Sequence, residues 1–330
     1  MSETDATGGV PAFEVLATGP LALLQDRGRP GFAHLGVTAS GAADRTSYAA
    51  ANRLVGNRAG AAAIEAVFGG LELRVLCTAL VAVTGAPTTV TVRRPSCDRF
   101  GMPSSAAEAH SGVFRTLSDH AFTVFAGDVV SLDPPEAGLR SYVAVRGGIA
   151  AQPVLDSRSS DVLSGLGPPP LAAGDLIVLG TDQAAAHASV SWPAADFART
   201  AWGLDRPAIR PPATVLRILR GPRDDWFGDP GWSALLDTTW TTSTDSNRVG
   251  VRLDAVTRID RLPQHGGELP SEGMVAGAVQ VPPSGRPVVF LRDHPVTGGY
   301  PVIGVLTEAS IDRAAQLRPG DPVRFVASDR

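Results

Sequence analysis

The sequence is 330 residues long with 44% hydrophobic and 19% charged residues, enough chain and apolar content for one large or two ordinary domains. A net charge of −4 gives no electrostatic reason to expect a nucleic acid or an anionic membrane as a partner. No lysine is present, so all 29 basic residues are arginines, which excludes a Schiff-base enzyme, a P-loop and a domain that carries biotin on lysine.

The start of the chain is polar and acidic and lacks the basic and apolar regions of a signal peptide. We therefore interpret residues 1–12 as a disordered leader. No later apolar run approaches the ~20 residues of a membrane span, so the sequence predicts a cytoplasmic protein without a membrane partner. Cys77 and Cys97 match no zinc or redox spacing and the six histidines occur singly, so no metal site is predicted.

A short strand is predicted to begin at Phe13, and a charged loop follows at residues 25–31. The loop holds two arginines, one aspartate and two glycines. Because a guanidinium matches the geometry of a carboxylate or a phosphate, Arg29 is a candidate to clamp an anion. Alternatively, an ion pair between Asp26 and Arg29 stiffens the turn. The sequence leaves both interpretations open.

One helix is clear, at about residues 41–55, where alanines fill the body and Gly56 suits the left-handed position past the end. Ser40 or Asp44 has the side chain to cap its start. Asn52 falls on or beside the apolar stripe of this helix, and a buried amide must be hydrogen-bonded. Asn52 therefore either ties down a neighbouring loop or faces a ligand.

The rest of the chain consists of short β-patterned runs separated by turns, with too few helices for a parallel doubly wound sheet. Residues 183–212 are rich in Ala, Pro, Ser and Trp and are interpreted as a connection. The sequence thus predicts an N-terminal β domain at 13–205 and a C-terminal β-barrel domain at 206–330. The predicted fold class is mostly β with closed barrels, because many short strands otherwise leave unprotected edges.

The stretch from 270 to 305 is the strongest candidate for a site. Two apolar runs are joined by Pro-Pro-Ser-Gly at 282–285, which predicts a β-hairpin. Gly298 and Gly299 let the backbone approach a ligand closely and leave N–H groups to point at an anion. Polar side chains that are costly to bury unpaired surround the hairpin. They are Ser271, Glu272, Gln280, Asp293, Thr297 and Tyr300.

The chain contains a set of distinctive motifs: QDRGRPGFAHLGVTASGAADRTSYAAANRLVGN, RGGI, DSRSS, SNRVGVRL, SEGMVAGAVQVPPSGRPVV and DHPVTGGYPVIG. Together they resemble the allophanate hydrolase subunit 2 family, which includes the C subunit of 5-oxoprolinase and half of the carboxyltransferase domain of urea carboxylase. The resemblance covers the chain from about Phe13 to Val326. The sequence departs from the family pattern at Asp156, where a glycine is usual, and near residues 168–170, 249 and 251.

The resemblance implies two cyclophilin-like β-barrel units and a subunit of an ATP-dependent hydrolase of cyclic amides, inactive alone. The implied reaction is 5-oxo-L-proline to L-glutamate, with a subunit 1 type protein (the B component of such an enzyme) and a LamB/YcsF-type subunit as partners. ATP is expected at the level of the complex, and a homodimer within a heterotetramer is possible. The alternatives are half of a biotin-dependent carboxyltransferase, with biotin on a partner chain, and a non-catalytic regulator of a kinase inhibitor.

The site residues that the motifs and the resemblance point to fall into two groups. The candidates for catalysis are Asp26, Asp44, Glu272 and Asp293. The candidates for substrate binding are Arg29, Ser40, Asn52, Arg146, Gln280, Thr297, Gly298, Gly299 and Tyr300. His294 is the one histidine of interest, because it follows Asp293 in the same loop.

Overall fold

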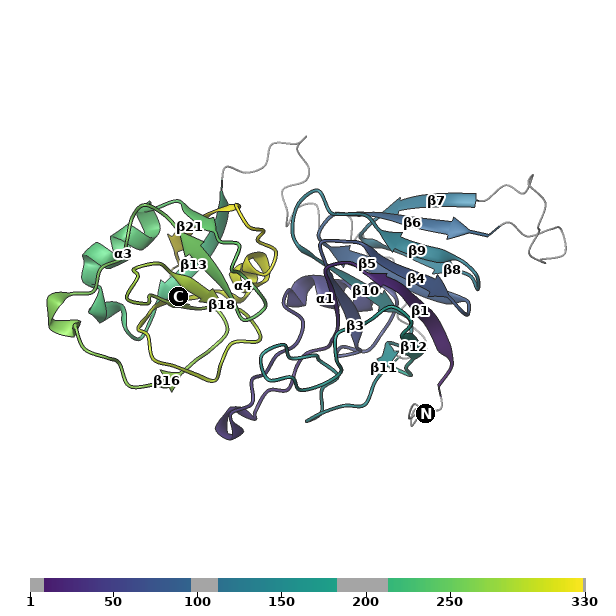
Figure 1. Cartoon of the computed structure of the whole chain (residues 1–330), viewed down its shortest axis with the longest axis horizontal. Coiled ribbons are helices and arrows are strands. Elements are labelled where there is room, and N and C mark those ends of the chain that lie inside the picture. Colours follow the sequence, from purple (N-terminus) through teal and green to yellow (C-terminus); the bar gives the residue numbers. More distant parts are fainter. Residues whose placement is uncertain (1–8, 96–111, 183–212, 329–330) are drawn as a thin grey trace. The chain divides into compact units, whose positions relative to one another are not determined.

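The computed structural model describes residues 9–95, 112–182 and 213–328. These form a mostly β fold with few helices, as predicted (Figure 1). The α-helices in the described ranges are α1 (Arg45–Leu54), α3 (Gly228–Asp237) and α4 (Glu308–Ala314), and the 3-10 helices are η1 (Ala33–Leu35), η2 (Asp224–Trp226) and η3 (Pro263–His265). None of the described helices is long and apolar enough to cross a membrane.

The chain divides into two compact units. Unit 1 comprises Met1–Asp26, Ser47–Ser160 and Gly167–Trp202, and unit 2 comprises Arg27–Thr46, Asp161–Leu166 and Gly203–Arg330. The sequence alone assigned 13–205 to one domain, so the grouping of 27–46 and 161–166 with unit 2 differs from that expectation. The expected connection at 183–212 lies outside the described residues, as do residues 1–8 of the expected leader.

Unit 1 is built from two antiparallel sheets. The seven-stranded sheet has the order β11-β12-β1-β4-β9-β6-β7, and the five-stranded sheet has the order β2-β3-β10-β5-β8. The strands are β1 (Pro11–Thr18), β2 (Leu21–Gln25), β3 (Ala63–Val67), β4 (Leu71–Val75), β5 (Ala79–Gly85), β6 (Thr89–Arg94), β7 (Gly112–Leu117), β8 (His120–Val124), β9 (Val129–Leu132), β10 (Arg140–Val145), β11 (Ile149–Ala150) and β12 (Leu176–Leu179).

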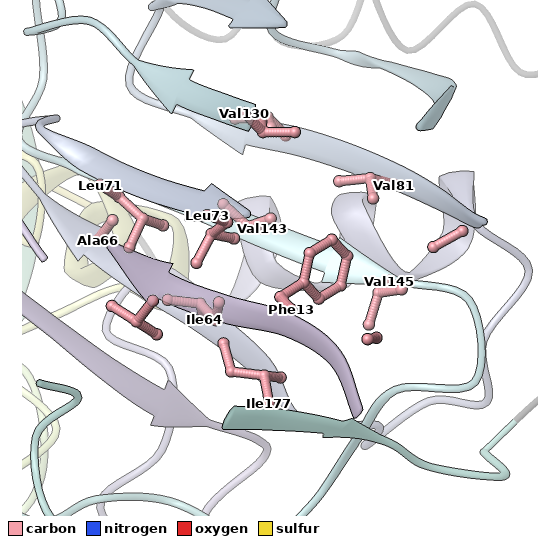
Figure 2. Packing of buried hydrophobic residues seen from close by; sticks show 14 of the residues in the cluster. Phe13, Ile64, Ala66, Leu71, Leu73, Val81, Val130, Val143, Val145 and Ile177 are labelled. Carbon is pink, nitrogen blue, oxygen red and sulfur yellow. The ribbon is translucent and has the colours of Figure 1, made fainter. Parts of the chain in front are cut away.

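The core of unit 1 forms where side chains from the two sheets meet, as Figure 2 shows for Phe13 and Leu73 from one sheet and Ile64 and Val143 from the other. Alternation along the strands produces this core, because every second side chain of a strand points to the same face. In β4, Leu71, Leu73 and Val75 are buried and the residues between them are not. Each large apolar side chain buried in this way contributes roughly 1.5–3 kcal/mol.

The helix α1 confirms the predicted helix but begins later than expected, at Arg45. The N–H groups of Arg45 and Thr46 donate to the carboxylate of Asp312 at 3.0 and 3.2 Å, so a residue distant in sequence binds the free N–H groups of the first turn. Gly56 follows the helix with a φ of +73°, as predicted.

Unit 2 is a closed barrel with the strand order β13-β20-β17-β18-β15-β14-β21. Its core contains Trp240, Phe227 and Phe325, and α3 and α4 pack against it through Leu235 and Ile311. Closure of the barrel removes unpaired strand edges. The strands are β13 (Thr214–Arg220), β14 (Trp240–Thr242), β15 (Gly250–Asp254), β17 (Ala278–Gln280), β18 (Val288–Phe290), β20 (Val302–Leu306) and β21 (Pro322–Ala327), and a separate two-stranded sheet contains β16 (Glu272–Gly273) and β19 (Thr297–Gly298).

Candidate functional site

The predicted hairpin is present as β17 and β18, which pair antiparallel with Val279 opposite Val289. Its strands are shorter than expected from the apolar runs. The Gly285 N–H donates to the carbonyl of Pro282 at 2.9 Å, and Gly285 has a φ of +73° that a side chain would strain. The hairpin belongs to the barrel wall. Of the candidate site residues, Gln280 lies on it, and Asp293 and residues 297–300 lie in the segment that follows it.

Asp293, in the loop after β18, is a fully buried carboxylate in unit 2. It accepts hydrogen bonds from Arg248 Nε and Nη2 at 2.9 and 3.2 Å, from Ser40 Oγ at 2.7 Å, and from the Val162 N–H at 3.1 Å. Arg248 also donates to the carbonyl of Gly41 at 2.7 Å. Asp293 therefore holds three distant parts of the sequence in one arrangement.

The loop held by Asp293 is under local backbone strain. Ser40 has a φ of +51°, which is unusual for a residue with a side chain. Gly28 packs so closely beneath it that an added Cβ would lie 2.3 Å from the carbonyl oxygen of Ala39 and 2.6 Å from that of Ser40. Non-glycine residues in such conformations persist where the surroundings over-determine them, often at binding sites. Ser40 is therefore positioned by Asp293 and does not cap α1.

A second buried carboxylate shapes the neighbouring segment of unit 2. Asp161 accepts a hydrogen bond from Thr38 Oγ1 at 2.6 Å and others from the N–H groups of Leu163 and Ser164. Burial alone would raise the pKa of Asp161, but these hydrogen bonds outweigh burial and hold the pKa below its ordinary value. The side chains of Val162 and Leu163 are left 43% and 47% exposed, an apolar tip on a rigid turn.

His294 is buried beside Asp293, and its Nδ1 lies 2.8 Å from the carbonyl oxygen of Pro295. Burial lowers the pKa of His294, so the imidazole is neutral at pH 7. A neutral ring next to a carbonyl carries its proton on Nδ1, and Nε2 then has a lone pair to accept a proton or a hydrogen bond. This geometry makes His294 a candidate base that the predicted set of site residues omitted.

Gln280 links β17 to the loop that contains the adjacent glycines. Its side chain is only 3% exposed, and Nε2 donates to the carbonyl of Tyr300 at 2.9 Å and to Met274 Sδ at 3.2 Å. Gly298 lies directly over this contact, because an added Cβ would be 2.5 Å from Gln280 Nε2. Gly299 has no atom that close, the nearest being 3.7 Å away. Neither glycine has a positive φ.

Glu272 lies opposite Gly298 in the two-stranded sheet of β16 and β19. Arg223 forms a forked ion pair with it, with Nε 2.9 Å from Oε1, and this hydrogen bonding lowers the pKa of Glu272. Glu272 is thus ionised at neutral pH and is no proton donor. Thr297 and Tyr300 are exposed at the same loop, so their hydroxyl groups reach solvent.

Asp26 belongs to unit 1, where the DSRSS segment surrounds it. Its carboxylate accepts from Ser157 Oγ and Ser159 Oγ, both at 2.6 Å, and from the Arg158 N–H at 2.6 Å. Asp156, where the resembling family usually has glycine, has a φ of +61°, which aspartate tolerates better than most residues. The departure from the family pattern therefore preserves the backbone of this segment.

The other predicted site residues are dispersed. Asp44 is buried and accepts from Gln316 Nε2 at 2.9 Å, and Arg29 is only 1% exposed in unit 2. In unit 1, Asn52 donates to the carbonyl of Ala61 at 3.1 Å, so it ties down a loop, and Arg146 is exposed. The described residues contain no group of three or more His, Cys, Asp or Glu able to hold a metal ion.

Sequence reasoning also missed Arg248 and Arg223, the two guanidinium partners of the predicted carboxylates. Arg248 stands inside the SNRVGVRL motif, which was a usable signal. In unit 2 the structure brings together two sets of predicted residues: Ser40 with Asp293, and Glu272 with Gln280 and 297–300. The second set combines exposed hydroxyl groups, a buried amide and an arginine next to a glycine-rich loop, which suits a small polar ligand with an anionic group.

Comparison with known proteins identifies relatives that match most of the chain. The family model for the carboxyltransferase domain, subdomains A and B, matches residues 35–327. The C subunit of the 5-oxoprolinase of Escherichia coli K12 is 31% identical over 317 residues, which cover 95% of this chain and 90% of that protein.

Two crystal structures resemble nearly the whole chain. The structure of a protein called TTHA0988 is 31% identical with a TM-score of 0.77, and the match covers 99% of this chain but 57% of that one. The urea amidolyase of K. lactis is 27% identical with a TM-score of 0.79, and the match covers 99% of this chain and 19% of that one. The chain thus spans little more than half of one solved relative and a fifth of the other.

Proposed function

Because the chain belongs to the family of the carboxyltransferase domain, subdomains A and B, we propose that it is a subunit of an ATP-dependent hydrolase that opens a cyclic amide. The specific reaction is that of a 5-oxoprolinase, 5-oxo-L-proline to L-glutamate. The observation that carries this proposal is coverage: the match spans 90% of the C subunit of the Escherichia coli 5-oxoprolinase, a protein of similar length. The match to the urea amidolyase covers only 19% of that protein.

The geometry of unit 2 supports a substrate site at the loop 297–300. The substrate has one carboxylate and one amide, which need a cation or N–H donors and a matched hydrogen-bond partner. Gln280 supplies a buried amide at the base of this loop, and the glycines allow a small molecule to approach the backbone. Asp293 holds the supporting loops, and His294 offers Nε2 as a proton acceptor.

The chain requires partners in this proposal. Asp293 and Glu272 are both engaged by arginines, so the two carboxylates of this loop system are poorly suited to act alone as acid or base. We place the remaining catalytic groups and the ATP site on a subunit 1 type protein, the B component, and on a LamB/YcsF-type subunit. Activity then appears only in the assembled complex, in which a homodimer of this chain is possible.

Reconstitution tests the proposal directly. The chain is co-expressed with each partner, the complex is isolated by size-exclusion chromatography, and ATP hydrolysis is measured with and without 5-oxo-L-proline. We expect 5-oxoproline-dependent release of glutamate from the complex only. The matched variants are Gln280→Leu, which removes the buried amide, and Gln316→Leu, which removes a buried amide at Asp44. Loss of turnover in the first but not the second supports the site, and full turnover by the isolated chain contradicts the need for partners.

The second candidate is half of a biotin-dependent carboxyl-transfer site, which the likeness to urea amidolyase favours. Biotin is carried on lysine, and this chain has none, so the biotin must arrive on a partner chain. Transfer of a carboxyl group from carboxybiotin to urea by the complex, without 5-oxoproline-dependent ATP hydrolysis, would establish this candidate instead.

A further inference from the structure

Unit 2 contains a hollow that belongs to none of the predicted site residues. It encloses about 320 Å³, which is within the usual size of small-molecule sites, roughly 300–1,000 Å³. The hollow lies between the turn at the end of the hairpin and the strap 255–271, the segment that joins β15 to β16. Its lining residues are Ile259, Asp260, Arg261, Gly266, Gly267, Glu268, Pro282 and Pro283.

The walls of the hollow are held by backbone hydrogen bonds. The Ile259 N–H donates to the carbonyl of Gly285 at 3.0 Å, and the Leu262 N–H donates to that of Trp226 at 2.8 Å. An added Cβ at Gly285 would lie 2.9 Å from the Cβ of Arg258, so this glycine allows the strap to lie close against the hairpin turn. These contacts hold the backbone of the two walls in place.

Arg261 is the cation of the hollow, and its position is fixed by aromatic contacts. Its guanidinium lies 5.3 Å from the centre of the Trp226 ring, and Trp226 stacks on His265 at 5.0 Å with an interplanar angle of 16°. This cation–π contact orients the guanidinium without using its N–H groups.

The hydrogen-bonding capacity of Arg261 is largely unused. Within the described residues, Nε is buried and has no hydrogen-bond partner, and Nη1 reaches only the Gly267 carbonyl at 3.5 Å. A buried donor without a partner costs free energy, and an arginine presents a fork that matches a carboxylate. Among the described residues, the N–H group of Gly267 also donates no hydrogen bond, so it adds a donor on the same wall.

The hollow also carries negative charge. Asp260 and Glu268 are exposed lining residues, and neither forms an ion pair with Arg261 or with any other described residue. A simple anion such as phosphate would gain from Arg261 but would be repelled by two carboxylates in the same small space. A ligand that presents an anionic group and a cationic group together satisfies both.

From these contacts we propose that this hollow binds a free α-amino acid as a zwitterion. Its carboxylate lies on Arg261 and the N–H group of Gly267, and its ammonium group faces Asp260 and Glu268. The proposal is independent of the proposed function, because the hollow shares no residue with the loop 297–300. The chemistry on the walls recognises the part that all amino acids share, and the volume leaves room for a side chain.

A ligand screen on the full chain tests whether the ligand is an α-amino acid. Each of the twenty standard L-amino acids is added in turn and the melting temperature is measured, followed by calorimetric titration of the one with the largest shift. The N-acetyl derivative of that amino acid removes the cation, its amide removes the anion, and inorganic phosphate is an anion alone. We expect the amino acid to bind and all three of the other compounds to bind about tenfold more weakly or not at all.

Variants locate the site. Arg261→Gln removes the charge and the fork, and we expect about a tenfold or greater loss of affinity for the amino acid. Arg258→Gln is the matched control, an exposed arginine of the same strap that does not line the hollow, and it should bind normally. Far-ultraviolet circular dichroism verifies that both variants are folded. No shift with any amino acid, tighter binding of phosphate, or equal binding by Arg261→Gln and the unaltered chain would each overturn the proposal.

Discussion

The carboxylate of Asp293 and the guanidinium of Arg248 form a two-point ion pair, with Nε to Oδ2 at 2.9 Å and Nη2 to Oδ1 at 3.2 Å, and both side chains are at most 2% exposed. The remaining hydrogen bonds to Asp293 come from Ser40 and from the backbone of Val162. This pair is therefore the point at which loops from widely separated parts of the sequence are tied to the barrel of unit 2.

Removing one partner of this pair should be far more damaging than removing both. Asp293→Ala leaves the charge of Arg248 buried and unpaired, and we expect the free energy of unfolding to fall by about 3–5 kcal/mol. The double variant with Arg248→Met should lose less than Asp293→Ala alone. Urea unfolding of the full chain measures both.

The surface pair Arg286–Asp254 is the control for this comparison, because its side chains are 49% and 43% exposed. Breaking it with Asp254→Ala should cost no more than about 1 kcal/mol. If Asp293→Ala were no more destabilising than this surface change, the pair would have no role in tying down the loops.

The secondary-structure elements whose formation depends on residues close together in the sequence were predictable from the sequence. The hairpin β17–β18 was predicted from its Pro-Pro-Ser-Gly turn, and α1 from its alanine-rich body and Gly56. By contrast, α3 was missed because it opens with Gly-Asp-Pro-Gly, residues that are typical of a turn, and it is stabilised by Trp232 and Leu235 against the barrel core. Tertiary packing there outweighs weak local propensity.

The site was only partly predictable for the same reason. Ser40 and Asp293 are 253 positions apart, and no periodicity or turn signal relates them. The resemblance to a known family selected both residues, but it could not show that Ser40 binds Asp293 instead of capping α1. The difference between Gly298 and Gly299 also lay beyond the sequence, because it depends on which of them packs against Gln280 and Met274.

The two candidate anion-binding arginines, Arg29 and Arg146, differ in burial, so replacing each with lysine should affect stability differently. Arg29 is 1% exposed, so Arg29→Lys alters a packed guanidinium and should lower the free energy of unfolding by about 2 kcal/mol. Arg146 is exposed, so Arg146→Lys should change stability by less than about 0.5 kcal/mol. If Arg146 holds the substrate carboxylate, the same change raises KM in the reconstituted complex. Unaltered kinetics for Arg146→Lys would assign it to the surface alone.

Asp119 should make the stability of the chain depend on pH. Burial raises the pKa of Asp119 from its ordinary 3.8 to about 6, despite a hydrogen bond from Ser118. Because the folded state binds the proton more tightly, this group favours folding below about pH 4, and the advantage is lost as the pH rises towards 6. The gap corresponds to roughly 3 kcal/mol at neutral pH as an upper limit.

Asp119→Asn removes this titration and preserves the turn, because asparagine also tolerates the φ of +79° at this position. We expect the variant to be more stable than the unaltered chain at pH 7.5, with the difference shrinking by pH 4. Urea unfolding at several pH values measures it. A difference that does not vary with pH would show that Asp119 has an ordinary pKa.

The sharpest test of the loop 297–300 compares its two glycines. Gly298→Ala would place a Cβ 2.5 Å from Gln280 Nε2 and 3.1 Å from Met274 Sδ, so the buried amide of Gln280 must move. Gly299→Ala meets nothing closer than 3.7 Å, and neither position has a positive φ.

We therefore expect Gly299→Ala to keep both the melting temperature and any 5-oxoproline-dependent ATP hydrolysis of the reconstituted complex. Gly298→Ala should lose most of the activity, and the displaced amide should lower the melting temperature by only a few degrees, since the barrel core is untouched. A Gly298→Ala protein with normal activity per folded molecule would remove this loop from the site. Loss of activity in Gly299→Ala alone would instead indicate that the ligand approaches the open face at Gly299.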